Sequence, residues 1–301
     1  MTEAASDRLG QFYKYVPAAT AKLVLTGSRL RWSSPLAFND VFDVPTELAS
    51  FSVAEISSAS IPFAVSLFEK LGLARFSPEQ REAAVALCSR ETLFSDEQAH
   101  RADASLEALR VQWREIVPTM RILCLCEHPN IAVMWGLYAD SNRGVVLRFD
   151  SVAAHDPPWL LAKPVTYTDT LPRFMRPDGI MEAGMAGPQA LFDDLCYTKT
   201  TDWSHEREWR VLCFAKLGEI GLSSDWPFEP KTLTEIILGP RVSDQDASDI
   251  SALLMHDFSH VRLLRTIPTA ANTIQIQPTS QLSDGEQGAA RPQLGISTLP
   301  P

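Results

Sequence analysis

The sequence predicts an α+β protein with a mixed, mainly antiparallel β core and an inserted helical segment. Short apolar stretches typical of strands lie near both ends of the 301-residue chain. Between them, residues 53–120 are rich in Ala, Leu, Glu and Arg, with apolar residues three and four positions apart, as amphipathic helices require. Because the helices are grouped between strands rather than alternating with them, the pattern favours α+β over a regular βαβ fold.

The expected strands combine apolar residues with flanking turn signals. The first covers residues 13–16 before Pro17, and the second covers 30–32 and ends at Ser33-Ser34-Pro35. Further strands are expected at 122–126, 144–149, 165–167, 209–214, 233–238, 261–264 and 273–277.

Helices are expected where caps and apolar spacing coincide. In the inserted segment we expect two or three helices, one of them starting at Ser77-Pro78, where Ser can cap and Pro can take the first helical position. Other helices are expected at 130–140, 188–199 and 243–258, the last capped by Ser243. The polar residues 1–10 and the Gln-, Ser-, Gly- and Pro-rich residues 278–301 are expected to be flexible, which leaves a single domain over 11–277.

The composition narrows the classes of partner and compartment. A net charge of −10 disfavours a broad basic surface that would bind nucleic acid or an anionic membrane, because such a surface requires clustered Lys and Arg. No apolar run is long enough to span a membrane, and no signal peptide is visible, so we expect a cytoplasmic protein. The five cysteines include Cys124 and Cys126, which lack a second Cys or His pair at zinc spacing. We therefore expect buried free thiols and no metal site.

Two polar and aromatic stretches are candidates for ligand binding. Residues 32–43 place Ser33, Ser34, Asn39 and Asp40 in a loop after a strand, although Asn and Asp often only close such loops through backbone hydrogen bonds. In residues 134–140, Met134, Leu137 and Tyr138 share one helix face, which core packing alone explains. Trp135 lies off that face beside a glycine, where another group can approach closely.

The stretch 202–210 is the strongest candidate, with one His, two Glu, two Trp and two Arg. We expect residues 202–205 to form a turn that leads into a strand through Glu206 and Arg210. In an extended chain Glu206, Glu208 and Arg210 point to one face. Repulsion between the two carboxylates would raise one pKa and suit general-base chemistry. The alternative is a salt-bridge ladder in which Arg210 neutralises a glutamate. We favour Glu206 as the functional carboxylate because Glu208 lies deeper in the strand.

Taken in order, these motifs resemble the bacterial family named domain of unknown function 2971. The resemblance spans residues 12–245 and rests on an ordered set of short motifs, in which Val16 and Val41 replace the Arg and Pro common in the family. The motifs are Tyr13-Lys14-Tyr15, Phe38-Asn39-Asp40 with Asp43, Cys124 to Cys126, Met134-Trp135, Tyr138-Ala139, Gly144 to Phe149, Trp203, His205-Glu206, Glu208-Trp209-Arg210, Ile236 and Gly239-Pro240.

A more distant resemblance is to ADP-ribosyltransferase-like folds, which have a split sheet. That resemblance implies that NAD is the substrate and that a late-strand Glu steadies the oxocarbenium-like transition state. Lys14, Ser33-Ser34 and Glu206 or Glu208 stand in the compatible order. The implied catalytic residues are Glu206, Glu208, Lys14 and Tyr138, and the implied cofactor-binding residues are Ser33, Ser34, Asn39, Asp40, Trp135, His205 and Arg210.

Three functions remain open from the sequence. The first is an NAD-consuming enzyme acting in a bacterial defence or toxin system. The second is a non-catalytic module that binds a small nucleotide or a protein through Trp135, Trp203 and Trp209. The third is a nuclease whose acids, Asp40, Asp43, Glu206 and Glu208, hold Mg²⁺. Convergence of Lys14, Ser33, Tyr138 and a glutamate on one cleft would favour the enzyme.

Overall fold

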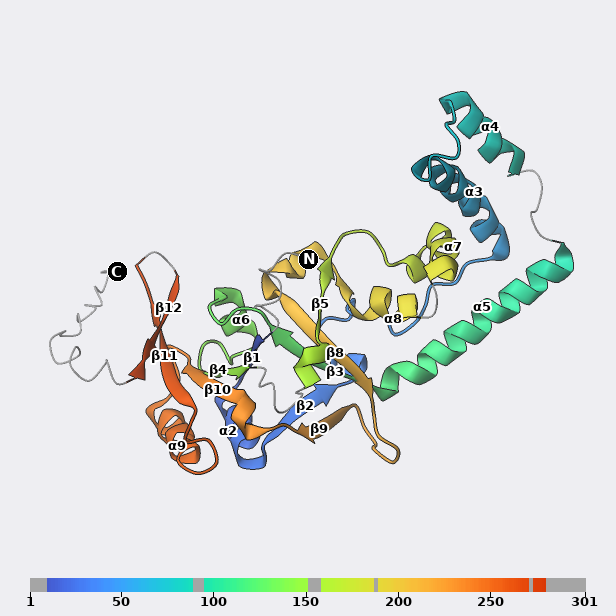
Figure 1. Ribbon diagram of the computed structural model, residues 1–301. Helices are drawn as coiled ribbons and strands as arrows, with labels where there is room; N and C mark the ends of the chain where they lie inside the picture. The colour runs from blue at the N-terminus through green and yellow to red at the C-terminus, as the bar shows by residue number, and fades with distance from the viewer. Residues whose placement is uncertain (1–9, 89–94, 151–157, 187–188, 271–272, 280–301) are drawn as a thin grey trace, which may run out of the picture.

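The structure, a computed structural model, describes residues 10–88, 95–150, 158–186, 189–270 and 273–279. The flexible ends predicted at 1–10 and 278–301 lie outside these ranges, except for Gly10, Pro278 and Thr279. The predicted α+β class is confirmed, because a mixed and mostly antiparallel sheet forms the centre of the described chain (Figure 1).

The main sheet follows a spatial order that differs from the chain order. Along it lie β12 (Ile274–Pro278), β11 (Arg262–Pro268), β10 (Leu233–Leu238), β4 (Val145–Asp150), β1 (Gln11–Val16), β3 (Met120–Cys126), β2 (Arg29–Ser33) and β9 (Ser223–Pro227). Strand β8 (Glu208–Phe214) pairs with β3 and also with the short β5 (Lys163–Pro164). A separate parallel pair is formed by β6 (Thr166–Tyr167) and β7 (Thr198–Lys199).

The sheet splits along one edge of β3. On its other edge β3 pairs with β8 over its whole length, from Met120 opposite Phe214 to Cys126 opposite Glu208. On the split edge, β3 pairs with β2 only at Ile122, opposite Ser33, and with β1 only at Cys126, opposite Tyr13. Strands β1 and β2 therefore diverge beside Cys124, and the sheet opens at this point.

Helices cover both faces of the β12–β1 half of the sheet (Figure 1). Helices α2 (Ala18–Gly27) and α9 (Asp244–Leu254) bury apolar residues against one face. The short helix α6 (Ala132–Leu137) packs on the opposite face. Helix α2 was missed in the sequence, and α9 is capped by Ser243 as predicted but ends earlier than Phe258.

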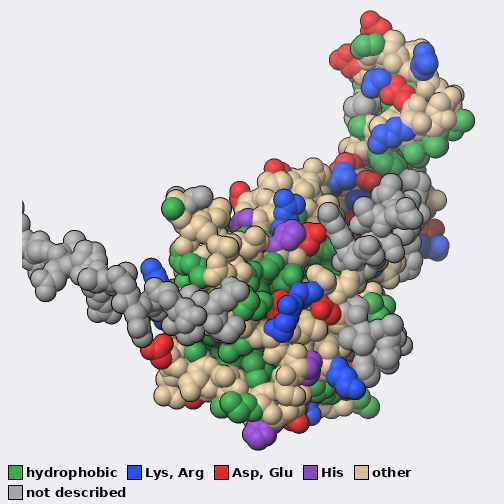
Figure 2. Space-filling view, turned by 60° about the vertical axis from the view of Figure 1, so that its left-hand side comes forward, with side chains coloured by type: hydrophobic (Ala, Val, Ile, Leu, Met, Phe, Trp, Pro, Cys, Tyr) green, Lys and Arg blue, Asp and Glu red, His purple; other side chains and the backbone are tan. Residues whose placement is uncertain are grey.

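The inserted segment forms three helices that extend away from the sheet. They are α3 (Val53–Lys70), α4 (Pro78–Cys88) and α5 (Asp96–Ile116). Figures 1 and 2 show the α3 and α4 end of this segment projecting away from the sheet, while α3 also packs against α7. The end of α5 near the sheet is anchored by Trp113, which is fully buried and donates its Nε1–H to the carbonyl of Pro45 at 2.8 Å. Two further helices, α7 (Pro177–Ala186) and α8 (Gln189–Cys196), follow β6 in the chain.

In the described parts of the chain, no helix combines the length and the apolar character that crossing a membrane would require.

Gly144 provides a test of how tightly the elements around the site are packed. A Cβ at this position would lie 2.3 Å from the carbonyl oxygen of Val16 and 2.9 Å from backbone atoms of Ala139. We expect Gly144→Ala to lower the free energy of unfolding by about 3 kcal/mol, as overpacking against backbone does. The matched control is Gly136→Ala in α6, where a Cβ meets nothing within 4 Å. This control should be neutral or stabilise by up to about 1 kcal/mol. If urea denaturation shows the same change in stability for both variants, the close packing around Gly144 is wrong.

Candidate functional site

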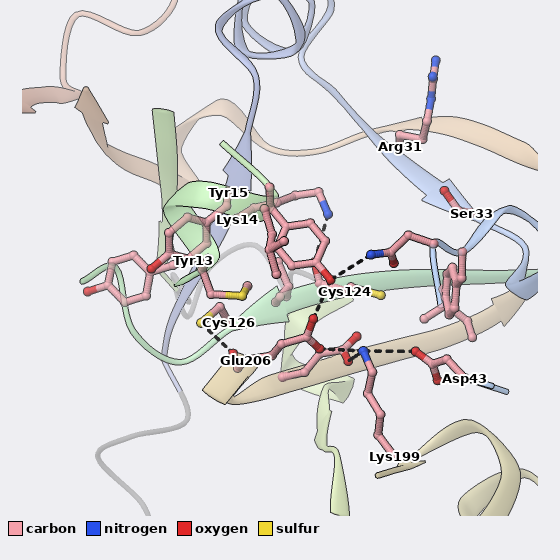
Figure 3. A pocket seen from close by; sticks show the side chains of 18 of the residues that line it. Tyr13, Lys14, Tyr15, Arg31, Ser33, Asp43, Cys124, Cys126, Lys199 and Glu206 are labelled. Atoms are coloured by element: carbon pink, nitrogen blue, oxygen red, sulfur yellow. Dashed lines mark hydrogen bonds and ion pairs between the residues drawn. The ribbon is translucent and has the colours of Figure 1, made fainter. Parts of the chain in front are cut away.

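A cavity of about 390 Å³ opens where the sheet splits (Figure 3). It is lined by strands β1, β2 and β3, by the loop after β2, by α6, and by residues at the β7 and β8 ends. The lining residues are Tyr13, Lys14, Tyr15, Arg31, Ser33, Ala37, Phe38, Asn39, Asp43, Ile122, Cys124, Leu125, Cys126, Met134, Leu137, Tyr138, Lys199, Glu206 and Glu208.

Strand alternation determines how β1 contributes to this cavity. Tyr13 and Tyr15 leave β1 on the face that carries α6, so Lys14 leaves it on the opposite face. The Nζ atom of Lys14 nevertheless reaches the gap and donates to the Cys124 carbonyl at 2.9 Å. Burial lowers the pKa of Lys14, although the nearby Cys124 and Glu208 oppose that shift. Lys14 therefore approaches the cavity from the side opposite Lys199, as Figure 3 shows.

Glu206 reaches the cavity from a turn and not from a strand. A 3₁₀ helix, η5, covers Thr201–Glu206, Arg207 adopts a left-handed conformation with φ 48°, and β8 begins only at Glu208. The prediction that Glu206 lies in the strand is therefore wrong, because the left-handed residue ends the helix and redirects the chain. The turn still brings the carboxylates of Glu206 and Glu208 to the same cavity.

The carboxylate of Glu206 is held at both oxygens. The Tyr138 hydroxyl donates to Oε1 at 2.5 Å, and Lys199 Nζ donates to Oε2 at 2.6 Å. Asn39 Nδ2 in turn donates to the Tyr138 hydroxyl at 3.4 Å. The backbone carbonyl of Glu206 accepts from Cys126 Sγ at 3.0 Å. Burial first, and then the hydrogen bond to Glu206, raises the pKa of Tyr138, so the phenol remains a donor.

Glu208 is engaged differently, in a buried ion pair with Arg210. The Arg210 guanidinium donates to both oxygens of Glu208, at 2.8 and 2.7 Å, and to both oxygens of Asp43, at 2.8 and 2.6 Å. Burial raises the pKa of the Glu208 carboxyl, but the charges of Arg210 and Lys199 outweigh it and lower that pKa to about 2. The raised pKa expected from repulsion between carboxylates is therefore not found at Glu208. Glu208 instead matches the alternative prediction, in which Arg210 neutralises a glutamate.

Lys199 is the main site residue that the sequence did not reveal. The helix predicted over 188–199 ends at Cys196, and Lys199 lies in the two-residue strand β7. Its Nζ lies 2.6 Å from Glu206, 3.4 Å from Asp43 and 3.7 Å from Glu208. Burial lowers the pKa of Lys199, but the three carboxylates outweigh burial and raise it overall.

The buried charges of this cluster do not balance. Asp43, Glu206 and Glu208 supply three carboxylates, whereas Lys199 and Arg210 supply two cations. All five side chains are at least nine-tenths buried. The cluster therefore has one more carboxylate than cations, with Lys199 closest to Glu206 and Arg210 shared between Asp43 and Glu208. Among the described residues no group of three or more His, Cys, Asp or Glu is arranged to hold a metal ion.

The cavity brings together more than half of the residues selected from the sequence. Of the expected catalytic residues, Glu206, Glu208, Lys14 and Tyr138 all line it. Of the expected cofactor-binding residues, Ser33 and Asn39 line it.

The other five expected cofactor-binding residues lie outside the cavity lining. Ser34 is fully buried and donates to the Val117 carbonyl, while Asp40 accepts from the Phe42 amide in an exposed turn. Trp135 has no exposed surface and packs edge-on against Tyr15, so the prediction that it lies off the packed face is wrong, and Leu137 of that predicted face is 54% exposed. His205 lies with Nδ1 3.0 Å from the Asp202 carbonyl. Arg210 is buried behind Glu208 and positions it without reaching the cavity.

The cysteines whose side chains are described are all free thiols. Cys126 and Cys196 are buried, and Cys124 and Cys213 are partly buried. Burial raises the pKa of Cys126 to about 12, which keeps the thiol protonated. The side chain of Cys88 lies outside the described residues.

The low pKa of Glu208 predicts how stability depends on acid. Because its pKa falls from an ordinary 4.5 to about 2 on folding, its ionised form stabilises the fold fully above about pH 4.5. That contribution, on the order of 3 kcal/mol, is lost as pH falls toward 2. Urea denaturation between pH 5 and pH 3 should therefore show a smaller loss of stability in Glu208→Gln than in the wild type. If the free energy of unfolding falls equally with pH in both proteins, the ionised Glu208–Arg210 pair does not contribute as described.

Neither family models, nor curated proteins, nor solved structures include a match to this chain.

Proposed function

We propose that the chain is an ADP-ribosyltransferase-like enzyme of the domain of unknown function 2971 type, which cleaves the bond between nicotinamide and ribose in NAD. One observation carries the proposal. Glu206 presents a carboxylate to a cavity, within a cluster of five buried side chains in which carboxylates outnumber cations by one, while the cation Lys14 lies on the other side of the cavity. Such a site favours a substrate that becomes more positive at one carbon as it reacts.

The chemistry of the proposed reaction fits this charge. When the N-glycosidic bond breaks, the bonding electron pair leaves with nicotinamide, which departs neutral, and positive charge develops on the ribose C1′ and ring oxygen. Glu206 stabilises that charge. Attack of water at C1′, with loss of one proton to solvent, then gives ADP-ribose. A nucleophilic acceptor in place of water gives an ADP-ribosylated product.

The remaining walls of the cavity suit a nucleotide. A volume of about 390 Å³ lies within the usual range for small-molecule sites. Tyr13, Tyr15 and Phe38 provide aromatic surface for a planar ring, and Lys14 provides a cation on the side opposite Glu206. The substrate therefore meets opposite charges at the two sides of the cavity.

The geometry gives the magnesium-dependent nuclease less support. Asp40 lies in an exposed turn, and Asp43 and Glu208 are both occupied by the Arg210 guanidinium. The four acids therefore do not present a shared set of free oxygens, which Mg²⁺ requires.

Incubation of the full chain with NAD, followed by chromatographic quantification of nicotinamide, tests the proposal. We expect release that increases with time and with protein concentration, above a protein-free control. If NAD raises the melting temperature but no nicotinamide appears, the non-catalytic binding module is the better description. If neither occurs, the proposal is wrong.

A further inference from the structure

The surroundings of Glu206 point to a specific role for a residue that the proposed reaction does not itself name. Resting on the proposed function, we propose that Lys199, held over the ring of Trp203, is a positioning residue that fixes the Glu206 carboxylate toward the substrate. Lys199 would not touch the reacting atoms. It would act through Glu206.

Distances single out Glu206 as the partner of Lys199. Lys199 has an exposed fraction of only 7%, and its contact with Glu206 is 0.8 Å shorter than its next closest, with Asp43 (2.6 against 3.4 Å). Together with the Tyr138 contact to the other oxygen, this bond limits rotation of the carboxylate about its last torsion. A carboxylate has about four acceptor positions, so these two contacts leave positions for a substrate hydroxyl.

Lys199 also contacts the ring of Trp203. The Lys199 Nζ lies 4.5 Å from the centroid of the Trp203 ring, within the range of a cation–π interaction. Trp203 belongs to η5, the same 3₁₀ helix that ends at Glu206. One short turn therefore carries both the carboxylate and the aromatic ring that holds its partner, so the two positions are coupled through local backbone geometry.

The two cations of the cluster divide the three carboxylates between them. Arg210 already pairs with Asp43 and Glu208 through both oxygens of each. In the described part of the chain Arg210 forms no ion pair with Glu206. Lys199 thus pairs with Glu206, the one carboxylate of the cluster that the Arg210 guanidinium does not reach. This is the carboxylate that the proposed reaction uses.

A double-mutant cycle on nicotinamide release tests the positioning role. We expect Lys199→Gln to lower kcat about 100-fold, the scale of a misplaced catalytic group, with KM for NAD nearly unchanged. In a Glu206→Gln background the same substitution should lower the residual rate little further, because no carboxylate remains to be positioned. A purely structural role would lower both backgrounds by the same factor and would overturn the inference.

Two further variants keep the test decisive if Lys199→Gln fails to fold. Trp203→Leu leaves every charge in place, and we expect kcat to fall about fivefold in the wild-type background and not in Glu206→Gln. Lys199→Arg, which restores a cation, should recover part of the rate lost in Lys199→Gln. Melting temperatures identify the folded variants. A wild-type rate in folded Lys199→Gln, or in Trp203→Leu, overturns the positioning role alone. Absence of release by the wild type overturns the proposed function and the positioning role with it.

Discussion

Replacing Arg210 with Met is expected to lower the free energy of unfolding by about 3–5 kcal/mol, the usual cost of breaking a buried ion pair from one side. Arg210 is fully buried and donates to Asp43, Glu208 and the Cys196 carbonyl. The Met side chain fills a similar volume but leaves the three buried carboxylates of Asp43, Glu206 and Glu208 with Lys199 as the only cation of the cluster. Urea denaturation at pH 7, followed by circular dichroism, measures the loss.

The control for this prediction is Arg31→Met. Arg31 also donates through two nitrogens to one carboxylate, that of Asp225, at 3.0 Å each, but both side chains are about half exposed or more. Exposed ion pairs contribute at most about 1 kcal/mol. If Arg210→Met costs no more than Arg31→Met, the buried cluster does not organise the site as described.

Replacing Glu206 with Gln is expected to lower the rate of nicotinamide release about 100- to 1,000-fold. The amide keeps the volume and one acceptor oxygen for Tyr138 or Lys199, but it removes the charge that stabilises the oxocarbenium-like transition state. Chromatographic quantification of nicotinamide at saturating NAD measures the effect, and the melting temperature shows that the variant is folded.

Glu97→Gln serves as the matched control for Glu206→Gln, because it makes the same chemical change at a carboxylate that is about three-quarters exposed on α5. We expect this control to keep the wild-type rate. A Glu206→Gln protein that is folded and releases nicotinamide at the wild-type rate would show that the reaction does not use this carboxylate.

Most of the longer strands were predictable because their signals are local, although β9 was missed. In β1, β3 and β4, apolar residues alternate or run together between clear turn residues, and the structure has strands at each predicted position. Short elements that depend on distant partners were not predictable. The strand β7 has only two residues, and it exists because it pairs with β6, some thirty positions earlier in the chain.

The site was predictable only in part, for the same reason. Its residue types were visible around positions 14, 33, 138 and 206, but the choice of ion-pair partners was not. Arg210 pairs with Asp43 across 167 positions in the chain, and Lys199 meets Glu206 only because the 3₁₀ helix η5 folds the chain back between them. The extended pattern placed Glu206 and Glu208 on one face, and it favoured Glu206 only because Glu208 lies deeper in the strand. The left-handed residue between them separates a cavity-facing carboxylate from one bound to arginine.

Binding of a non-cleavable NAD analogue, in which a methylene replaces the ring oxygen of the nicotinamide ribose, tests the central claim most directly. Isothermal titration of the full chain should show saturable binding with one site per molecule. Ser33→Phe, which places a ring in the cavity, should abolish that binding, whereas Gly136→Ala in α6, where added bulk meets nothing, should leave it unchanged. Absence of binding by the wild type, or equal binding by folded Ser33→Phe, would contradict the claim that NAD occupies the cavity where the sheet splits.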